Sequence, residues 1–166
     1  MSYNWDKYFI DMARFIATKS KDPKTKVGCV IVGPDHEIRT TGYNGMPRGL
    51  NDALPERSIN PEKRRWYEHS ERNAIYNSAR HGTALKGCTV YITAPPCSDC
   101  VRGLIQVGIV EIVAAKDHSW KTWEEHMERA TKMMDEAGII FRYFEEEKDD
   151  ENPSNSNSGE ECSTGS

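Results

Sequence analysis

Two short motifs contain the residue types that bind transition metals. The first is His69-Ser70-Glu71, and the second is the Cys-x-x-Cys pair formed by Cys97 and Cys100 directly after Pro96. An imidazole nitrogen and two thiolates form a three-ligand set that suits Zn²⁺ and leaves the fourth tetrahedral position for water. Because the two cysteines are three positions apart, one helical turn places both sulfurs on the same side. The motifs therefore predict a zinc site with His69, Cys97 and Cys100 as ligands.

Glu71 is the residue in these motifs that can carry a proton. It follows His69 by two positions, so its carboxylate can approach a metal-bound water without being a ligand itself. From there the carboxylate can take a proton from the water and pass it on. A helix that starts at Cys97 would add free N–H groups and a positive dipole end, which favour thiolates. The combination is typical of a hydrolytic zinc site with Glu71 as the catalytic acid and base.

Each motif taken alone has a simpler interpretation. His-x-Glu is common on surface helices, and a lone Cys-x-x-Cys can be half of a structural zinc site or a redox pair. A structural site needs a fourth ligand, but the candidates Cys29 and Cys88 lie in or beside apolar strands and are more easily explained as core residues. A non-enzymatic, zinc-stapled interaction module with an acidic tail is thus an alternative. Glu71 argues against it, because a purely structural site has no use for a carboxylate beside an open coordination position.

The rest of the chain alternates between helix-like and strand-like segments that could position these residues. Apolar residues at helical spacing predict helices that begin at Trp5, His69, Cys97 and near Trp123, the last with a capping box formed by Thr122 and Glu125. Short β-branched runs predict strands at 26–32, 37–43, 89–93, 109–115 and 139–144. Residues 44–61 are rich in Gly, Pro, Asn and Asp and predict a long loop. Strands that alternate with helices after an opening hairpin indicate an α/β fold.

Length and composition favour one folded domain. The chain has 166 residues, a net charge of −4 and 37% hydrophobic residues. Its mildly acidic balance argues against a polynucleotide partner, which usually requires a basic excess. No apolar run approaches the roughly 20 residues of a membrane span, and no signal peptide is visible, so we expect a cytoplasmic protein without a membrane partner. From Glu145 the sequence is acidic and rich in Ser, Asn and Gly, so we expect a domain at 1–144 and a disordered tail at 145–166.

The order of the motifs resembles that of the zinc-dependent cytidine deaminase superfamily, whose signature is His-x-Glu followed by Pro-Cys-x-x-Cys. Within it the resemblance narrows to the deoxycytidylate (dCMP) deaminases and extends from Trp5 to about Phe144. The segments that carry it are Asp22–Gly28, Gly42–Gly49, His69–Ile75, Pro96–Cys100 and Gly103–Gly108. Two features depart from the family. Ser70 stands where Ala is usual, and no Cys/His set is visible for the second, structural zinc that some relatives carry.

The resemblance implies a three-layer α/β/α fold with a five-stranded mixed sheet. It also implies hydrolysis of dCMP to dUMP and ammonia, which supplies dUMP for thymidylate synthesis, by a zinc-activated water whose proton Glu71 carries to N3 of cytosine. A homohexamer regulated by dCTP and dTTP is further implied, with Mg²⁺ accompanying the triphosphate. Deaminases of free cytosine, guanine or a tRNA base stay open as alternatives. The acidic balance disfavours the tRNA base, and Gly42-Tyr-Asn-Gly45 disfavours the other two.

The resemblance also assigns contacts to the substrate. The Ser70 N–H would face the carbonyl edge of the base, the carbonyls of Ala94 and Pro95 would face the leaving ammonia, and Val27 would pack on the ring. Asn44 resembles the residue that binds the sugar hydroxyl, although a turn residue in Asn-Gly is the simpler interpretation. The 5′-phosphate needs cations or N–H donors, and the candidates are Lys116, His118, Lys121 and Arg48. Candidates for the nucleotide effector site are Tyr43, Asn44, Gly45 and Arg80.

Overall fold

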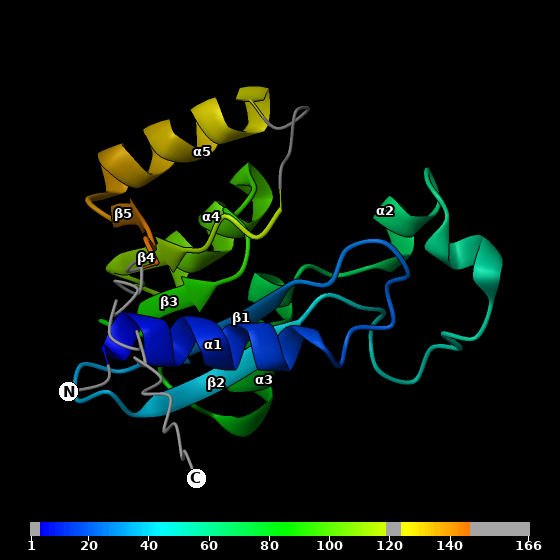
Figure 1. The fold of residues 1–166 in the computed structure, drawn as a ribbon, viewed down its shortest axis with the longest axis horizontal. Coiled ribbons are helices and arrows are strands. Elements are labelled where there is room, and N and C mark those ends of the chain that lie inside the picture. The colour runs from blue at the N-terminus through cyan, green and yellow to red at the C-terminus, as the bar shows by residue number, and fades with distance from the viewer. Residues whose placement is uncertain (1–3, 119–123, 147–166) are drawn as a thin grey trace, which may run out of the picture.

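The computed structural model describes residues 4–118 and 124–146, which form one sheet of five strands in the order β2-β1-β3-β4-β5 (Figure 1). The strands are β1 (Gly28–Val32), β2 (Ile38–Tyr43), β3 (Thr89–Ile92), β4 (Glu111–Ala114) and β5 (Ile140–Tyr143). β1 pairs antiparallel with both β2 and β3, whereas β3, β4 and β5 run parallel. The opening hairpin and the two later crossovers thus give the mixed sheet that we expected.

Helices cover both faces of the sheet. α1 (Trp5–Ala17) lies on one face, and α3 (Ser70–His81), α4 (Ser98–Gln106) and α5 (Glu124–Ala137) lie on the other (Figure 1). This arrangement confirms the three-layer α/β/α fold. Two short helical turns, η1 (Pro55–Ser58) and α2 (Lys63–Trp66), lie in or directly after the segment predicted as a loop. They are too short to leave a periodic apolar pattern in the sequence.

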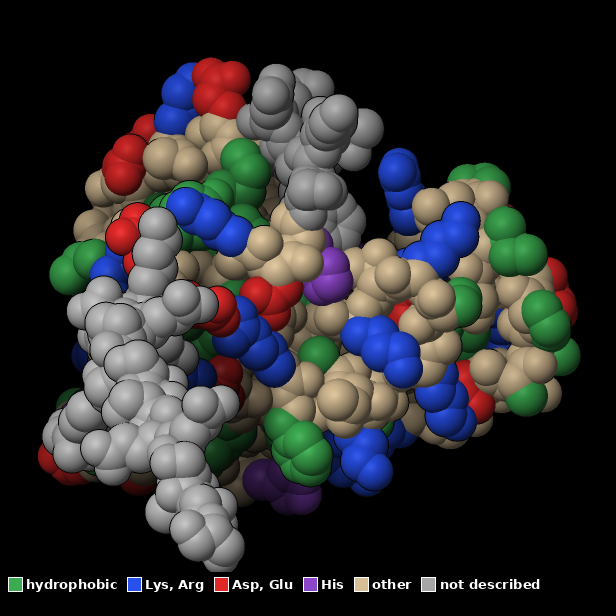
Figure 2. Space-filling model, in the orientation of Figure 1, with side chains coloured by type: hydrophobic (Ala, Val, Ile, Leu, Met, Phe, Trp, Pro, Cys, Tyr) green, Lys and Arg blue, Asp and Glu red, His purple; other side chains and the backbone are tan. Residues whose placement is uncertain are grey.

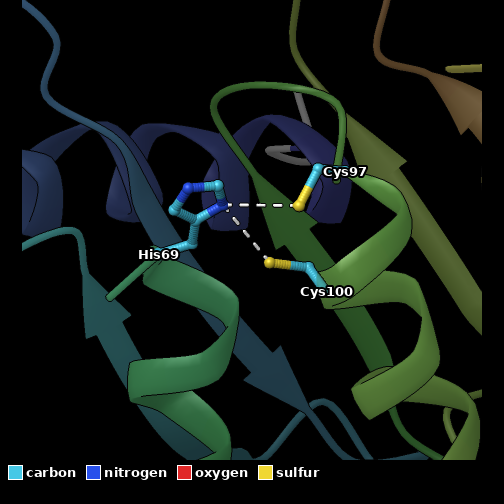
Figure 3. A group of neighbouring side chains, drawn as sticks. All are labelled: His69, Cys97 and Cys100. Carbon is cyan, nitrogen blue, oxygen red and sulfur yellow. Dashed lines mark hydrogen bonds between the residues drawn. The ribbon is translucent and has the colours of Figure 1, made fainter. Parts of the chain in front are cut away.

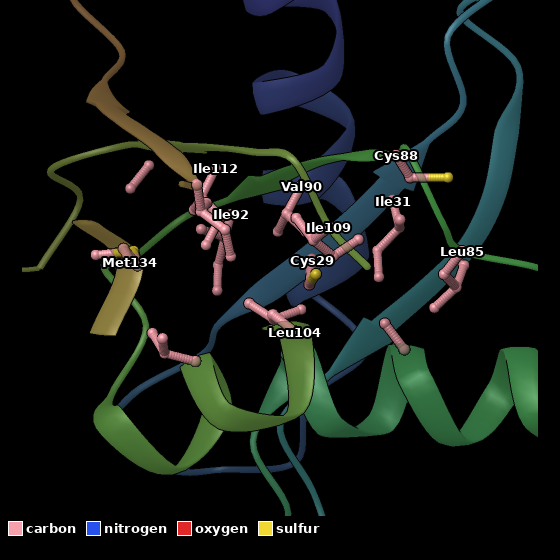
Figure 4. Packing of buried hydrophobic residues seen from close by; sticks show 14 of the residues in the cluster. Cys29, Ile31, Leu85, Cys88, Val90, Ile92, Leu104, Ile109, Ile112 and Met134 are labelled. Carbon is pink, nitrogen blue, oxygen red and sulfur yellow. The ribbon is translucent and has the colours of Figure 1, made fainter. Parts of the chain in front are cut away.

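Alternation along the strands divides the core into two apolar layers. Val30 and Val32 of β1 face α1, where Phe9 and Ile10 are completely buried. The intervening residues face α3, α4 and α5, in a cluster that includes Cys29, Ile31, Val90, Ile92, Leu104, Ile112 and Met134 (Figure 4). Cys88 lies in this second cluster and is 1% exposed. Cys29 and Cys88 are therefore core residues, as the sequence indicated.

Two glycines allow helices to approach the hairpin closely. A Cβ at Gly28 would lie 1.9 Å from the carbonyl oxygen of Ala13 in α1. A Cβ at Gly42 would lie 2.2 Å from the carbonyl oxygen of Ser70 at the start of α3. Both contacts involve backbone atoms, which cannot move aside as a flexible side chain would. Gly42 thus fixes how close the first turn of α3 comes to β2.

The outer edge of β2 is capped by side chains of α3. The carbonyl oxygen of Thr41 accepts a hydrogen bond from the Asn77 amide at 2.6 Å, and that of Tyr43 accepts one from the Asn73 amide at 2.8 Å. Asn73 and Asn77 are four residues apart and therefore lie on the same side of the helix. They occupy carbonyl groups that an edge strand otherwise offers to another strand.

Some expectations fall outside the described residues, namely those on Lys121, on Thr122 of the capping box and on the tail beyond Glu146. The end of α5 is described, and it is followed by Gly138 with φ of 71°, the left-handed conformation that favours glycine after a helix. No helix in the described ranges has the length and apolar character needed to cross a membrane.

Candidate metal centre and active site

The residues predicted to bind metal lie at the starts of two helices. His69 and Cys97 directly precede α3 and α4, and both have extended backbones with ψ of 159° and 166°. Neither side chain forms a capping hydrogen bond with its own helix, so both are directed toward the space between the helices. Cys100 lies in the first turn of α4, on the side of Cys97 (Figure 3). Two positive helix ends therefore converge on this point, which favours negatively charged ligands.

The three candidate ligand atoms fit one tetrahedral metal ion. His69 Nδ1 lies 3.5 Å from the sulfur of Cys97 and 3.5 Å from that of Cys100, and all three atoms lie within 4.8 Å of one another. Zinc bonds of about 2.0 Å to nitrogen and 2.3 Å to sulfur at tetrahedral angles place those atoms about 3.6 Å apart. The observed spacing and the His/Cys/Cys donor set are those of a zinc site with one position left for another ligand.

The two cysteines are not equivalent electrostatically. A hydrogen bond from the Cys100 thiol, together with the neighbouring His69, lowers the pKa of Cys97 to about 4. The pKa of Cys100 is raised by its hydrogen bond to Cys97 and by burial. The hydrogen bond with Cys97 also raises the pKa of His69. The cluster therefore holds a thiolate even before a cation adds its charge.

Glu71 points into the same region from the first turn of α3. Its side chain is buried, with 3% of the residue exposed, and burial raises the pKa of the carboxyl group. The His69 charge acts in the opposite direction, as does the hydroxyl of Ser70, which donates to Glu71 Oε2 at 2.9 Å. A buried carboxyl group with a raised pKa is suited to accept and release a proton near neutral pH.

The long segment before α3 is closed on itself next to the metal centre. Gly45 and Glu68 exchange two backbone hydrogen bonds of 3.0 and 2.9 Å, which bring residue 45 beside the residue that precedes His69. The η1 and α2 turns therefore belong to a loop whose two ends meet at the site. This closure explains how a structurally irregular segment can hold His69 in a fixed place.

Asp22 connects this loop to the backbone segment directly before Val27, a role that was not expected from the sequence. Its carboxylate is completely buried, forms an ion pair with Lys63, and accepts the backbone N–H groups of Lys24 and Thr25 at 2.9 and 3.1 Å. Burial alone would raise the pKa of Asp22, but these donors hold it below its ordinary value. An Asp-Pro pair often begins an Asx turn, in which the Asp side chain accepts a backbone N–H two residues later. The hydrogen bond from Lys24 could therefore have been predicted from the sequence, whereas the ion pair with Lys63 could not.

The Asn44 side chain holds the backbone around Val27. Its Nδ2 group donates to Thr25 O at 2.8 Å and to Asp22 Oδ2 at 3.1 Å, and its Oδ1 accepts the Val27 N–H at 2.8 Å. Both amide hydrogens are thus used within the protein. Only a lone pair on Oδ1 is left for a ligand, which would have to be a hydrogen-bond donor.

The remaining predicted residues are distributed around this centre. Val27 is partly buried directly before β1, and Ala94 and Pro95 form the turn between β3 and Cys97. Tyr43 is exposed at the end of β2, and Gly45 follows Asn44 in the loop. Arg80 is exposed in the last turn of α3, away from His69 at its start.

The predicted phosphate-binding cations are not all brought together. Lys116 Nζ lies 4.6 Å from the centre of the Tyr143 ring on β5, and Arg48 donates to Asn77 on α3. His118 lies beside the segment that leads into Val27, since its Nε2 is 3.1 Å from the carbonyl oxygen of Lys26. On the face drawn in Figure 2, Lys and Arg side chains gather toward the side that carries α2, whose sequence includes Lys63, Arg64 and Arg65.

Comparisons with known proteins agree with this geometry. Residues 3–116 match the family model for the cytidine and deoxycytidylate deaminase zinc-binding region. The deoxycytidylate deaminase of Homo sapiens is 37% identical over 145 residues, covering 84% of this chain and 79% of the human protein. A probable deoxycytidylate deaminase of Drosophila melanogaster is 35% identical over 150 residues, covering 84% and 71%. The dCMP deaminase of cyanophage S-TIM5, solved with dCMP and dUMP, has the same fold, with a TM-score of 0.70, 21% identity, and coverage of 87% of this chain and 99% of that one.

Proposed function

The chain belongs to the cytidine and deoxycytidylate deaminase family of zinc-binding enzymes, and from that premise we propose that it hydrolyses dCMP to dUMP and ammonia. The convergence of His69, Cys97 and Cys100 beside the buried Glu71 carries the chemistry of this proposal. The names of its relatives, and the dCMP and dUMP bound to the cyanophage enzyme, support the substrate. The product, dUMP, suits a place before thymidylate synthesis.

His69, Cys97 and Cys100 would hold the zinc ion. When bound, zinc supplies a water whose pKa is lowered toward 7. Glu71 would accept a proton from the attacking water and deliver it to N3 of the cytosine ring as the water oxygen bonds to C4. Glu71 would then take the remaining proton of the hydroxyl group on C4 and pass it to the amino group, so that the C4–N bond breaks, ammonia leaves and C4 becomes the carbonyl carbon of dUMP. The burial of Glu71 favours this cycle because it brings the protonated and ionised forms closer in free energy.

Backbone groups near the metal ligands would hold the base. The N–H of Ser70 would donate to the carbonyl edge of cytosine, and the carbonyl groups of Ala94 and Pro95 would accept from the leaving ammonia. Val27 would pack on the ring. Asn44 would accept a hydrogen bond from a sugar hydroxyl through Oδ1, in agreement with the use of both its amide hydrogens inside the protein.

The contacts to phosphate and to effectors are also proposals. His118 and the lysines at 116 and 121 follow the strand that ends near the site, and His118 has the support of its contact with Lys26. An effector nucleotide, dCTP or dTTP with Mg²⁺, would bind around Tyr43, Asn44, Gly45 and Arg80. We propose that the enzyme works as a homohexamer in the cytoplasm.

Ammonia release from a panel of substrates tests the proposal. The purified protein is mixed with dCMP, dCTP, deoxycytidine or cytosine, each with and without dCTP and dTTP as effectors. Deoxycytidine should react at least about 10-fold more slowly than dCMP, because the donors that would bind the 5′-phosphate are left without a partner, at a cost of roughly 1–3 kcal/mol for each one that the bound substrate buries. Equal rates for dCMP and cytosine would point to a deaminase of another substrate.

The variant Glu71→Gln separates proton transfer from metal binding. It should keep close to one zinc per chain, measured by metal analysis, and lose about 10²–10⁴-fold in turnover of dCMP. Loss of zinc together with activity would show that Glu71 is a metal ligand and not the proton carrier.

A further inference from the structure

The side chain of Ser70 makes a contact that the proposed mechanism does not use. Ser70 and Glu71 are consecutive residues in the first turn of α3. Both are buried, with exposed fractions of 0% for Ser70 and 3% for Glu71. Ser70 Oγ donates a hydrogen bond to Glu71 Oε2 at 2.9 Å. Consecutive side chains on a helix ordinarily point in different directions. The contact therefore requires at least one of the two side chains to bend toward the other.

This contact leaves the two carboxylate oxygens of Glu71 in different situations. Oε2 is held by the Ser70 hydroxyl, and Oε1 takes no part in that contact, so we expect Oε1 to be the oxygen that exchanges protons with water and base. A glutamate has three side-chain torsions, and a proton carrier is effective only when its oxygen lies within hydrogen-bond reach of the atoms that it serves. A hydroxyl can donate to the ionised carboxylate and accept from the protonated acid. It can thus hold Glu71 throughout the proton cycle.

Ser70 is itself held in place by the fold. Its carbonyl oxygen approaches β2 so closely that Gly42 has no room for a Cβ. The backbone at Ser70 is therefore fixed against the hairpin, and the hydroxyl is presented to Glu71 from a rigid position.

We infer that the Ser70 hydroxyl is a positioning group for Glu71, distinct from the backbone N–H of the same residue that is proposed to contact the base. The inference rests on the proposed function, since it concerns the orientation of the proton carrier. Ser70 does not exchange protons with the substrate; it restricts the carboxyl group to the conformation in which Glu71 does.

The variant Ser70→Ala removes the hydroxyl and keeps the backbone N–H. It should lower kcat for dCMP about 10-fold. Such a change corresponds to about 1.4 kcal/mol, slightly less than a hydrogen bond to a charged group usually contributes. Its KM and its zinc content should stay within about 2-fold of the wild-type values, because the base contact and the ligands are untouched. Ser70→Thr, which retains a hydroxyl, should recover most of kcat. Wild-type kcat in Ser70→Ala would overturn the inference.

Ser78→Ala is a matched control. Ser78 is also buried on α3, but its hydroxyl donates to the carbonyl oxygen of Ile75, two turns from the site. The same atoms are removed from the same helix, so kcat should not change. A similar fall in kcat for both variants would show a general effect on the helix and would overturn the inference.

A double-mutant cycle with Glu71→Gln identifies the route of the effect. If Ser70 acts through the Glu71 carboxylate, Ser70→Ala should cause little further loss in the Glu71→Gln background. A further 10-fold loss there would show that Ser70 acts independently of Glu71, against the inference. High activity of Glu71→Gln itself would instead contradict the proposed function, so the two failures can be told apart.

Discussion

At the scale of single residues, the cysteines divide into two environments that predict different chemistry. Cys97 and Cys100 lie at the start of a helix and contact His69. Cys29 and Cys88 are enclosed by aliphatic side chains, and burial raises the pKa of both thiols. A thiol is a good zinc ligand only when it can ionise. Burial raises the pKa of Cys100 as well, so it is the grouping of His69, Cys97 and Cys100 around one point that supports metal binding by the first pair.

Substitution of the cysteines tests this division. Cys97→Ala and Cys100→Ala should each lose bound zinc and deaminase activity, because two remaining ligands cannot hold the ion tightly. Cys88→Ala changes a buried thiol in the same way and should keep one zinc per chain. Metal content by mass spectrometry and ammonia release give the two readouts. A Cys100→Ala protein that retains a full zinc complement after dialysis against a weak chelator would contradict the assignment.

At the scale of elements, a network of charges joins the first helix to the last strand. Arg142 of β5 donates to both carboxylate oxygens of Asp6 in α1 and to Glu111 of β4, and Tyr91 of β3 donates to Asp6 at 3.1 Å. The hydrogen bonds from Arg142 hold the pKa of Asp6 below its ordinary value. These contacts join the first turn of α1 to Tyr91 of β3 and Arg142 of β5.

The lowered pKa of Asp6 gives a pH-dependent contribution to stability. Because the pKa is lower in the folded protein, the contribution is present above the unfolded value of about 4 and is lost as pH falls through the folded pKa. The difference in unfolding free energy between wild type and Asp6→Asn should be about 1 kcal/mol or less at pH 7, and it should shrink below pH 4. Urea unfolding of both proteins at pH 7, 5 and 3 measures it. A difference that stayed constant down to pH 3 would argue against an ionic origin.

Much of the element structure was predictable, for reasons that individual residues make clear. The helices from Trp5, Ser70 and Ser98 have regular apolar spacing, and the strand residues around Val30 and Val90 alternate between two buried layers. Local patterns of this kind are encoded in consecutive residues. The strand order β2-β1-β3-β4-β5 was not predicted from periodicity, because pairing depends on residues far apart in the chain.

The site was predictable where backbone position decides it and less so where side-chain direction does. His69 and Cys97 precede helices, so their motifs fixed their place. Lys116 and Arg48 follow elements near the site, but their side chains turn to Tyr143 and Asn77, which a linear sequence does not indicate. The ion pair between Asp22 and Lys63 joins residues 41 positions apart, so no local sequence pattern predicts it.

At the scale of the whole molecule, charge is unevenly divided between the domain and its end. Residues 148–166 contain five acidic residues and one lysine, so their removal changes the net charge from −4 to 0. Residues 1–147 taken together therefore have a net charge of 0. Arg14 forms an ion pair with Glu146 at 2.8 Å, which keeps the chain attached to α1 up to that residue.

Truncation after Glu147 tests whether the acidic end takes part in catalysis. Because it offers almost no apolar surface to bury and the Arg14–Glu146 pair is retained, turnover of dCMP should stay near the wild-type rate. Truncation after Phe144, which also removes Glu146, is the matched comparison for that ion pair. Activity and sedimentation velocity report on chemistry and assembly. A large loss of either after the first truncation would show that the acidic residues contact the domain.

The two asparagines of α3 that cap β2, Asn73 and Asn77, link metal binding to protection of the sheet edge. The helix that covers this sheet edge directly follows His69, so an opening of α3 would uncover the edge and disrupt the metal centre at the same time. A ligand that binds only the closed form makes such openings rarer by mass action. Zinc bound at this site would thereby act as a safeguard against strand-to-strand aggregation, and protein starved of metal would aggregate sooner than metal-loaded protein at the same temperature.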